Sequence, residues 1–307
     1  LVGYMAGSAI VGTHYNTALG HNAYSAGTAA HNTCLGVSTG VAASGDSNTL
    51  VGSHAGTALT DGPGNVLIGH YAGAAMTTSD YNIAIGFQAL DALTTNSHNN
   101  IAIGANALTT QAADQAGATT GHSIAIGTEA LNLQNDGDAI NLAIGYRCGD
   151  AITTGTKNTL IGQFAGSSIQ DDSHNTAVGY EALLNATAGD GNIAVGSYAM
   201  GLGAVTGSNN VCVGRLAGYD ITAGDSNVMV GRSAGANVTT GKQNVIIGLD
   251  ACGLGVLANA SSTQGMYNVV VGPQAGYDLT TGQSNILLGK DAGANFTDNY
   301  QNVAIGS

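Results

Sequence analysis

The chain has 307 residues, of which only 8% are Asp, Glu, Lys or Arg, and it contains 48 Gly, two Pro and no Trp. Its net charge of −13 and its six basic residues exclude a nucleic-acid partner, because neutralising phosphates requires a basic surface. No run of about 20 apolar residues occurs, so we expect no membrane insertion in this segment. The surface must consist mainly of Asn, Ser, Thr and Gln.

One unit, Asn-x-apolar-(Ile/Val/Leu)-Gly-x-x-Ala-(Gly/Leu), recurs along the whole chain, mostly at steps of 16 to 18 residues. We number positions within each copy from the leading Asn, which is position 0. Ser123 replaces this Asn once, and a degenerate copy ends at Gly3. The leading asparagines are Asn16, Asn32, Asn48, Asn65, Asn82, Asn100, Asn141, Asn158, Asn175, Asn192, Asn210, Asn227, Asn244, Asn268, Asn285 and Asn302.

Self-similarity at a fixed period of this size is typical of solenoids, in which each copy forms one turn. We therefore predict a single continuous repeat domain over residues 1–307, folded as an all-β parallel solenoid of about 17 rungs. Both ends of the chain lie inside a copy, so we expect a fragment of a longer fibre.

Each copy begins with a predicted strand at positions 1 to 3. Position 3 is Ile, Val or Leu in every copy, and position 2 is always apolar. A short apolar run bounded by Asn and Gly favours a strand buried on both faces. We expect the Asn side chains at position 0, from Asn48 to Asn285, to stack along the axis as an amide ladder that satisfies turn backbone groups.

The glycine at position 4 is expected to be a backbone requirement, since only glycine enters positive φ or permits close backbone approach without steric cost. The Ala found at position 7 in nearly every copy indicates tight packing between layers. Turn signals such as Thr-Thr-Gly then close each rung. We single out seven of these position-4 residues as turn glycines: Gly86, Gly104, Gly162, Gly179, Gly196, Gly231 and Gly289.

Two copies are longer than the rest, and the extra residues form expanded loops at 109–122 and 254–267. Insertions in a solenoid emerge on its surface while the rungs stay in place. These loops are therefore the best candidates for direct contact with a receptor.

A coil of this size encloses little volume, and its Ala-rich interior cannot use two apolar strand faces. We expect one face to fill the coil and the other to pack against a partner chain, as in obligate interfaces. Cyclic symmetry is the usual closed solution, and we predict a homotrimer.

Residues 82–90, 100–108 and 175–183, which follow the pattern Asn-x-Ala-(Ile/Val)-Gly-x-x-Ala-Leu, resemble the repeats of bacteriophage tail-fibre shafts. They are also similar to the repeats in the heads of trimeric autotransporter adhesins, which form left-handed parallel β-rolls. The resemblance implies a trimeric attachment fibre on a virion or outside a cell. The longer period of this chain favours the phage-fibre alternative.

Candidate sites for chemistry are few. Five of the eight histidines lie one or two residues before the start of a copy and are expected in turns: His14, His31, His98, His122 and His174. The four cysteines are expected to act as small core residues without disulfides. We expect the acidic pairs Asp136/Asp138 and Asp171/Asp172 to lie in solvated turns rather than to bind calcium.

Residues 231–235 match a Gly-x-Ser-x-Gly nucleophile motif, but other copies fill the same positions without Ser. We therefore expect no enzyme activity, no metal and no cofactor.

Three functions remain open. The first is a structural shaft whose specificity resides elsewhere in the fibre. The second is an adhesin head that binds a receptor or glycan on the host surface directly through the expanded loops. The third is ice binding by the Thr at position 12, which we disfavour because adjacent Thr residues in a strand point to opposite faces.

Overall fold

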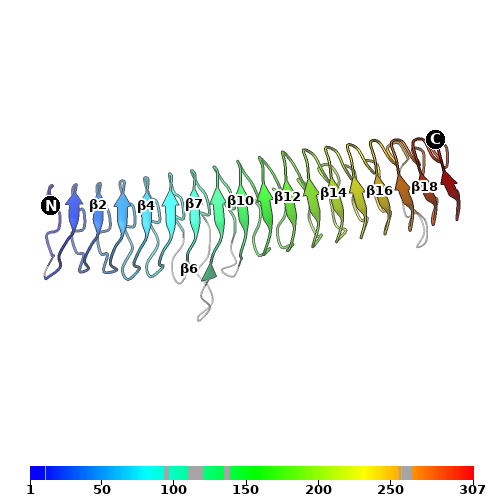
Figure 1. The fold of residues 1–307 in the computed structure, drawn as a ribbon. Helices are drawn as coiled ribbons and strands as arrows, with labels where there is room; N and C mark the ends of the chain where they lie inside the picture. The colour runs from blue at the N-terminus through cyan, green and yellow to red at the C-terminus, as the bar shows by residue number, and fades with distance from the viewer. Residues whose placement is uncertain (11, 93–96, 110–119, 135–138, 256, 258–264) are drawn as a thin grey trace. The chain divides into compact units, whose positions relative to one another are not determined.

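The computed structural model describes residues 1–307 except 11, 93–96, 110–119, 135–138, 256 and 258–264 (Figure 1). The described residues form strands and turns with no helix, and they build a parallel β-solenoid. The chain divides into two compact units, Leu1–Lys157 and Asn158–Ser307.

Unit 1 stacks short strands in parallel, with each position opposite the same position of the next copy. A separate pair, β6 (Ser97–His98) and β8 (Thr120–Gly121), forms a second small parallel sheet. The stacked strands are β1 (Thr17–Leu19), β2 (Thr33–Leu35), β3 (Thr49–Val51), β4 (Val66–Ile68), β5 (Ile83–Ile85), β7 (Ile101–Ile103), β9 (Ile124–Ile126) and β10 (Leu142–Ile144).

Unit 2 repeats the arrangement with nine strands in the same parallel register. These are β11 (Thr159–Ile161), β12 (Thr176–Val178), β13 (Ile193–Val195), β14 (Val211–Val213), β15 (Val228–Val230), β16 (Val245–Ile247), β17 (Val269–Val271), β18 (Ile286–Leu288) and β19 (Val303–Ile305).

The described chain makes about 15 turns, fewer than the 17 rungs expected from the number of copies. A complete turn runs from one stacked strand to the next. The eight strands of unit 1 bound seven turns and the nine of unit 2 bound eight. The expected number, 17, counts repeat copies, whereas the observed number, about 15, counts complete turns between stacked strands.

Only the middle residue of each strand enters the core. Position 2 is buried in nearly every strand, whereas positions 1 and 3 are half-buried or exposed. Ala at position 7 and the apolar residue at position 11 complete the core, as Ala165 and Ile169 do beside Leu160. Within one chain, the strand is therefore buried on one face and not on both.

The position-4 glycines combine an unusual backbone conformation with a close contact. Their φ angles lie between 123° and 145°, a region essentially restricted to glycine. A Cβ atom on any of the seven glycines singled out above would lie 2.2 to 2.6 Å from the backbone of the next position-4 glycine. The contact is unavoidable, because successive turns stack directly on one another.

Positive φ alone does not demand glycine in this fold. The residue before the leading Asn is left-handed in most copies, with φ of 63° at His174 and 59° at Asn209. Glycine is therefore required at position 4 for two reasons: φ is larger there, between 123° and 145°, and the backbone of the next turn lies too close for a Cβ atom.

We predict that Gly231→Ala destabilises the turns around β15 and β16 by more than about 3 kcal/mol, because its Cβ would lie 2.6 Å from the Gly248 carbonyl oxygen. Gly191→Asn should be tolerated, since Asn209 occupies the equivalent left-handed position one turn later. Hydrogen exchange of the neighbouring amides measures both effects, and equal protection in the two variants would contradict the prediction.

Candidate functional site

The asparagines at position 0 form a continuous buried ladder within each unit. The backbone N–H of a leading residue donates to Oδ1 of the preceding leading Asn at 2.8 to 3.1 Å, except at Asn141, whose N–H donates to Ser123 Oγ at 3.4 Å. All thirteen asparagines expected in the ladder, from Asn48 to Asn285, are buried.

The Nδ2 group of a ladder Asn donates to a backbone carbonyl near the end of the same copy, and it thereby joins the strand to the segment that closes the copy. Asn227 illustrates the pattern, because its Nδ2 donates to Gly241 O at 2.7 Å and to Asn210 Oδ1 at 3.0 Å. Its own Oδ1 accepts from both the backbone and the side chain of Asn244. One side chain thus satisfies buried groups on three turns.

The ladder is repaired where Ser123 replaces the Asn. Gln134, at the normally apolar position 11 of the same turn, is fully buried and its Nε2 donates to Ser123 Oγ at 3.0 Å. Its Oε1 accepts from Asn141 Nδ2 at 3.0 Å. Two departures from the repeat therefore compensate each other: the shorter Ser leaves space, and Gln134 fills it with an amide.

A second compensation occurs at Tyr24, which occupies position 8, normally Gly or Leu. Its ring fills the space of the absent position-11 side chain, since a Cβ on Gly27 would lie 2.1 Å from the ring. Its hydroxyl donates to Ala29 O and accepts from Asn32 Nδ2. The tyrosine thus replaces an apolar core residue and still serves the ladder.

Asp172 departs from the expected solvated turn, because it is only 6% exposed whereas Asp171 is exposed. Its Oδ2 and the Nδ2 of nearby Asn175 are both buried without a hydrogen-bond partner. Burial raises the pKa of Asp172, and the N–H of Gly189 partly offsets this. The expectation for Asp171/Asp172 is therefore wrong for Asp172, while Asp136 and Asp138 lie outside the described residues.

The two residues that directly follow the position-4 glycine are aromatic or cationic in many copies. We call positions 5 and 6 the corner ridge. Rings stack along it between turns, with centroids 5.0 Å apart for His54 and Tyr71. Its aromatic and cationic members include Tyr4, His21, His54, His70, Tyr71, Phe87, Tyr146, Arg147, Phe164, Tyr180, Tyr198, Arg215, Arg232 and Lys290.

Sequence reasoning identified the glycine before this ridge but missed the ridge itself. The signal was present, because four of the six basic residues fall at position 5 or 6. None of the 19 acidic residues occupies any position from −1 to 5. The strand face and its edges therefore lack negative side-chain charge in a strongly acidic chain.

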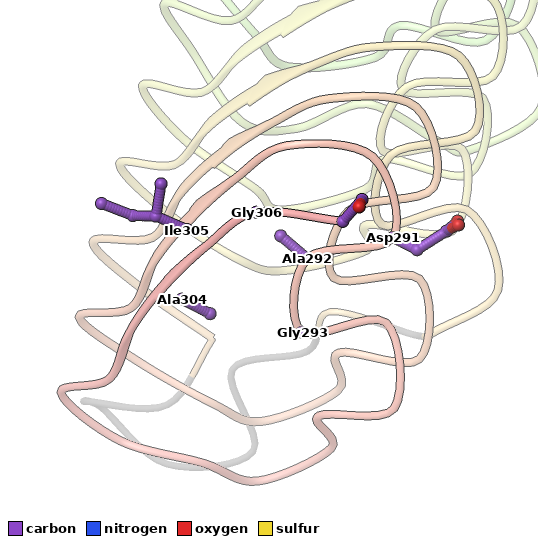
Figure 2. Close-up of a pocket in the computed structure, with 7 residues that line it drawn as sticks. Asp291, Ala292, Gly293, Ala304, Ile305 and Gly306 are labelled. Carbon is purple, nitrogen blue, oxygen red and sulfur yellow. The ribbon is translucent and has the colours of Figure 1, made fainter.

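Position 6 of the corner ridge and position 3 of the strand point in different directions. At the end of unit 2, Figure 2 shows Ala292 and Ala304 directed into the coil, Ile305 at position 3 directed outward on one side, and Asp291 at position 6 of the preceding copy directed outward on the other. These residues line a hollow with Gly293, Gly306 and Ser307. It is the interior of the coil seen end-on, and we assign it no ligand.

The histidines and cysteines do not converge on a site. Among the described residues, no group of three or more His, Cys, Asp or Glu could hold a metal ion. His98 lies in β6 rather than in a plain turn, with Nδ1 3.4 Å from Asp80 Oδ2. The four cysteines are buried, and burial raises the pKa of Cys34 to about 12, which disfavours the reactive thiolate.

The expanded loops cannot be placed as receptor sites. Residues 110–119 of the first loop, and residues 256 and 258–264 of the second, lie outside the described residues. The described part of the chain contains no helix long and apolar enough to cross a membrane.

Removing one ladder amide should destabilise the turns on both sides of it. We predict that Asn227→Ala costs on the order of 3 kcal/mol, because it leaves buried groups of Asn244 and Gly241 without partners. Hydrogen exchange should quicken at β14 to β16. Asn295→Ala is the matched control, since Asn295 is exposed in the same unit, and equal loss in both variants would refute the ladder's energetic role.

Replacing Asp172 should stabilise the chain in a pH-dependent way. Its raised pKa means that its contribution to stability is greatest below the ordinary carboxylate pKa and is lost as pH rises through the raised value. We predict that Asp172→Ser gains about 1–3 kcal/mol at pH 7 and much less at pH 4. Ser97 shows the compatible geometry, with Oγ accepting from Asn100 Nδ2 at 2.8 Å. Denaturant unfolding at both pH values checks this, and a pH-independent gain would contradict it.

Comparison with known proteins finds no family model that matches this chain and no curated protein with significant similarity to it.

Proposed function

We propose that this chain is part of the structural shaft of a trimeric attachment fibre, of the phage tail-fibre kind, with no enzymatic role. One observation carries the proposal: the outward strand positions are apolar or Thr, and never charged, in a chain whose composition demands a mainly polar surface. Ile193 is 38% exposed, Ile247 37% and Ile286 41%. Apolar surface arranged contiguously in this way favours an interaction with another protein.

The composition of the strand face supports a second copy of the same chain as the partner. Its centre consists of Val, Ile, Leu and Thr, and position −1 beside it carries Tyr or His in several copies and no Asp or Glu. Apolar centres depleted of charge, with Tyr enriched, are typical of protein–protein interfaces. Both copies would present the same inter-turn spacing, so their outward rows would match in register.

The internal construction supports a mechanical role. Each turn is hydrogen-bonded to the next by backbone groups at the strand, at the corner and in the later turns. The Asn ladder adds side-chain bonds through the interior. A stack of this kind contacts only nearest neighbours, which suits an extended spacer.

Cyclic symmetry closes such an association without leaving an apolar face exposed. The resemblance to phage and adhesin repeats implies three chains and a left-handed coil. It also implies a location on a virion or outside a cell, with host receptor recognition by another part of the fibre.

The proposal predicts that the purified chain is a trimer by mass photometry or sedimentation. Val228→Lys combined with Val269→Lys should dissociate it, because each places a charge in the centre of the strand face. Ala223→Lys combined with Asn295→Lys is the control, since it adds the same charge at exposed positions outside the face. A folded monomeric parent chain, or dissociation by both pairs, would reject this interface.

A further inference from the structure

Two arginines lie side by side on the corner ridge of unit 2. Arg215 and Arg232 both occupy position 5, on the consecutive turns that begin with β14 and β15, and both are exposed. The backbone N–H of Ser233 donates to Arg215 O at 2.9 Å, which holds the two turns together. Paired strands lie about 4.8 Å apart, so the two side chains start from neighbouring points.

An anion bound between the two arginines would relieve the weak repulsion between their exposed charges. Arg215 forms no ion pair with any described residue. Arg232 has only an exposed contact of 3.5 Å with Asp250, which contributes little.

Two tyrosines continue the ridge on the preceding turns. Tyr180 and Tyr198 have ring centroids 5.2 Å apart and nearly perpendicular planes. Hydrogen bonds to Glu181 and Tyr198 raise the pKa of Tyr180 to about 12, so its phenol stays neutral. The N–H of Tyr198 donates to Tyr180 O at 2.9 Å, and the N–H of Leu216 to Ser197 O at 3.1 Å, which fixes the backbone of this row.

We propose that the ridge formed by Tyr180, Tyr198, Arg215 and Arg232 binds a linear acidic polysaccharide lying along the stacking direction of unit 2. Sugar rings stack on the tyrosines, and carboxylate or sulfate groups bind the two guanidinium groups, which suit planar anions. The four residues lie on four consecutive turns and span about 14 Å, which fits an extended chain better than a single small anion.

Other ligand classes fit less well. Nucleic acid would need a longer row of cations than two arginines provide. A second copy of this chain is assigned to the apolar centre of the strand face, at positions 1 and 3. Arg215 and Arg232 lie at position 5, outside that centre, and both are exposed in this chain. This inference goes beyond the fibre function and does not depend on it.

Binding is measured by titration calorimetry with oligogalacturonate and with dextran sulfate, which separate carboxylate from sulfate recognition, and with neutral dextran. The full chain should bind at least one acidic probe and not neutral dextran. Arg215→Ala with Arg232→Ala should weaken binding ~10-fold. Ala105 shows that position 5 accepts alanine.

The aromatic contribution is tested by Tyr198→Asn. Asn is chosen because Asn106 holds the same left-handed conformation at position 6, with φ of 55° against 60° at Tyr198. We expect ~3-fold weaker binding, in line with the modest energy of a single exposed aromatic contact. Unchanged affinity would remove the tyrosines from the proposed site.

The matched control is Lys242→Ala with Lys290→Ala, which removes two positive charges outside the four-residue site and should leave affinity unchanged: Lys242 lies off the corner ridge, and Lys290 lies on it three turns beyond Arg232. Equal weakening by both double variants, or equal binding of single-stranded polynucleotide, would overturn the proposal in favour of general attraction to polyanions. No binding of either acidic probe would overturn it directly. Mass photometry of the same samples tests the trimer separately, so the two proposals fail independently.

Discussion

Close stacking of identical positions on successive turns is the constraint on which the rest of this structure depends. Backbone hydrogen bonds set the spacing of the turns, and at that spacing each position-4 glycine lies against the next. No side chain fits there, so the glycine recurs in every copy. The same spacing lets one amide reach the next, which makes the Asn ladder possible. Glycine, alanine and asparagine thus repeat for one shared reason.

The exceptions to the repeat follow the same logic. Gln134 compensates for Ser123, and Tyr24 compensates for the missing side chain at Gly27, each within a single turn. Local repair is sufficient because a turn of a solenoid contacts only its neighbours. Asp172 has no such repair, and it leaves two buried polar atoms unpaired. A repeat array can carry an isolated defect of this kind because neighbouring turns supply most of the stability.

The inward positions explain stability, and both of our functional proposals concern the outward positions. Positions 3 and 6 point to different sides of the coil, so one turn of about 17 residues presents more than one outward surface. The apolar strand face suits association with sister chains. The ridge carries aromatic and cationic side chains in many turns, and its residues vary from turn to turn. Our two proposals use these two surfaces separately, and each is consistent with the other.

The sequence by itself determined the parallel solenoid, the strand positions and the identity of the ladder asparagines. These follow because the same residue types recur at the same positions of every copy, and one backbone conformation of the copy satisfies all of them. Only the tertiary structure decided that the strand is buried on one side within a chain, that Asp172 is enclosed, that His98 lies in a strand and that position 6 points to another side than position 3. Those features depend on where each side chain points, and the left-handed residues at positions −1, 6 and 8 redirect the chain in ways that a sequence period does not reveal.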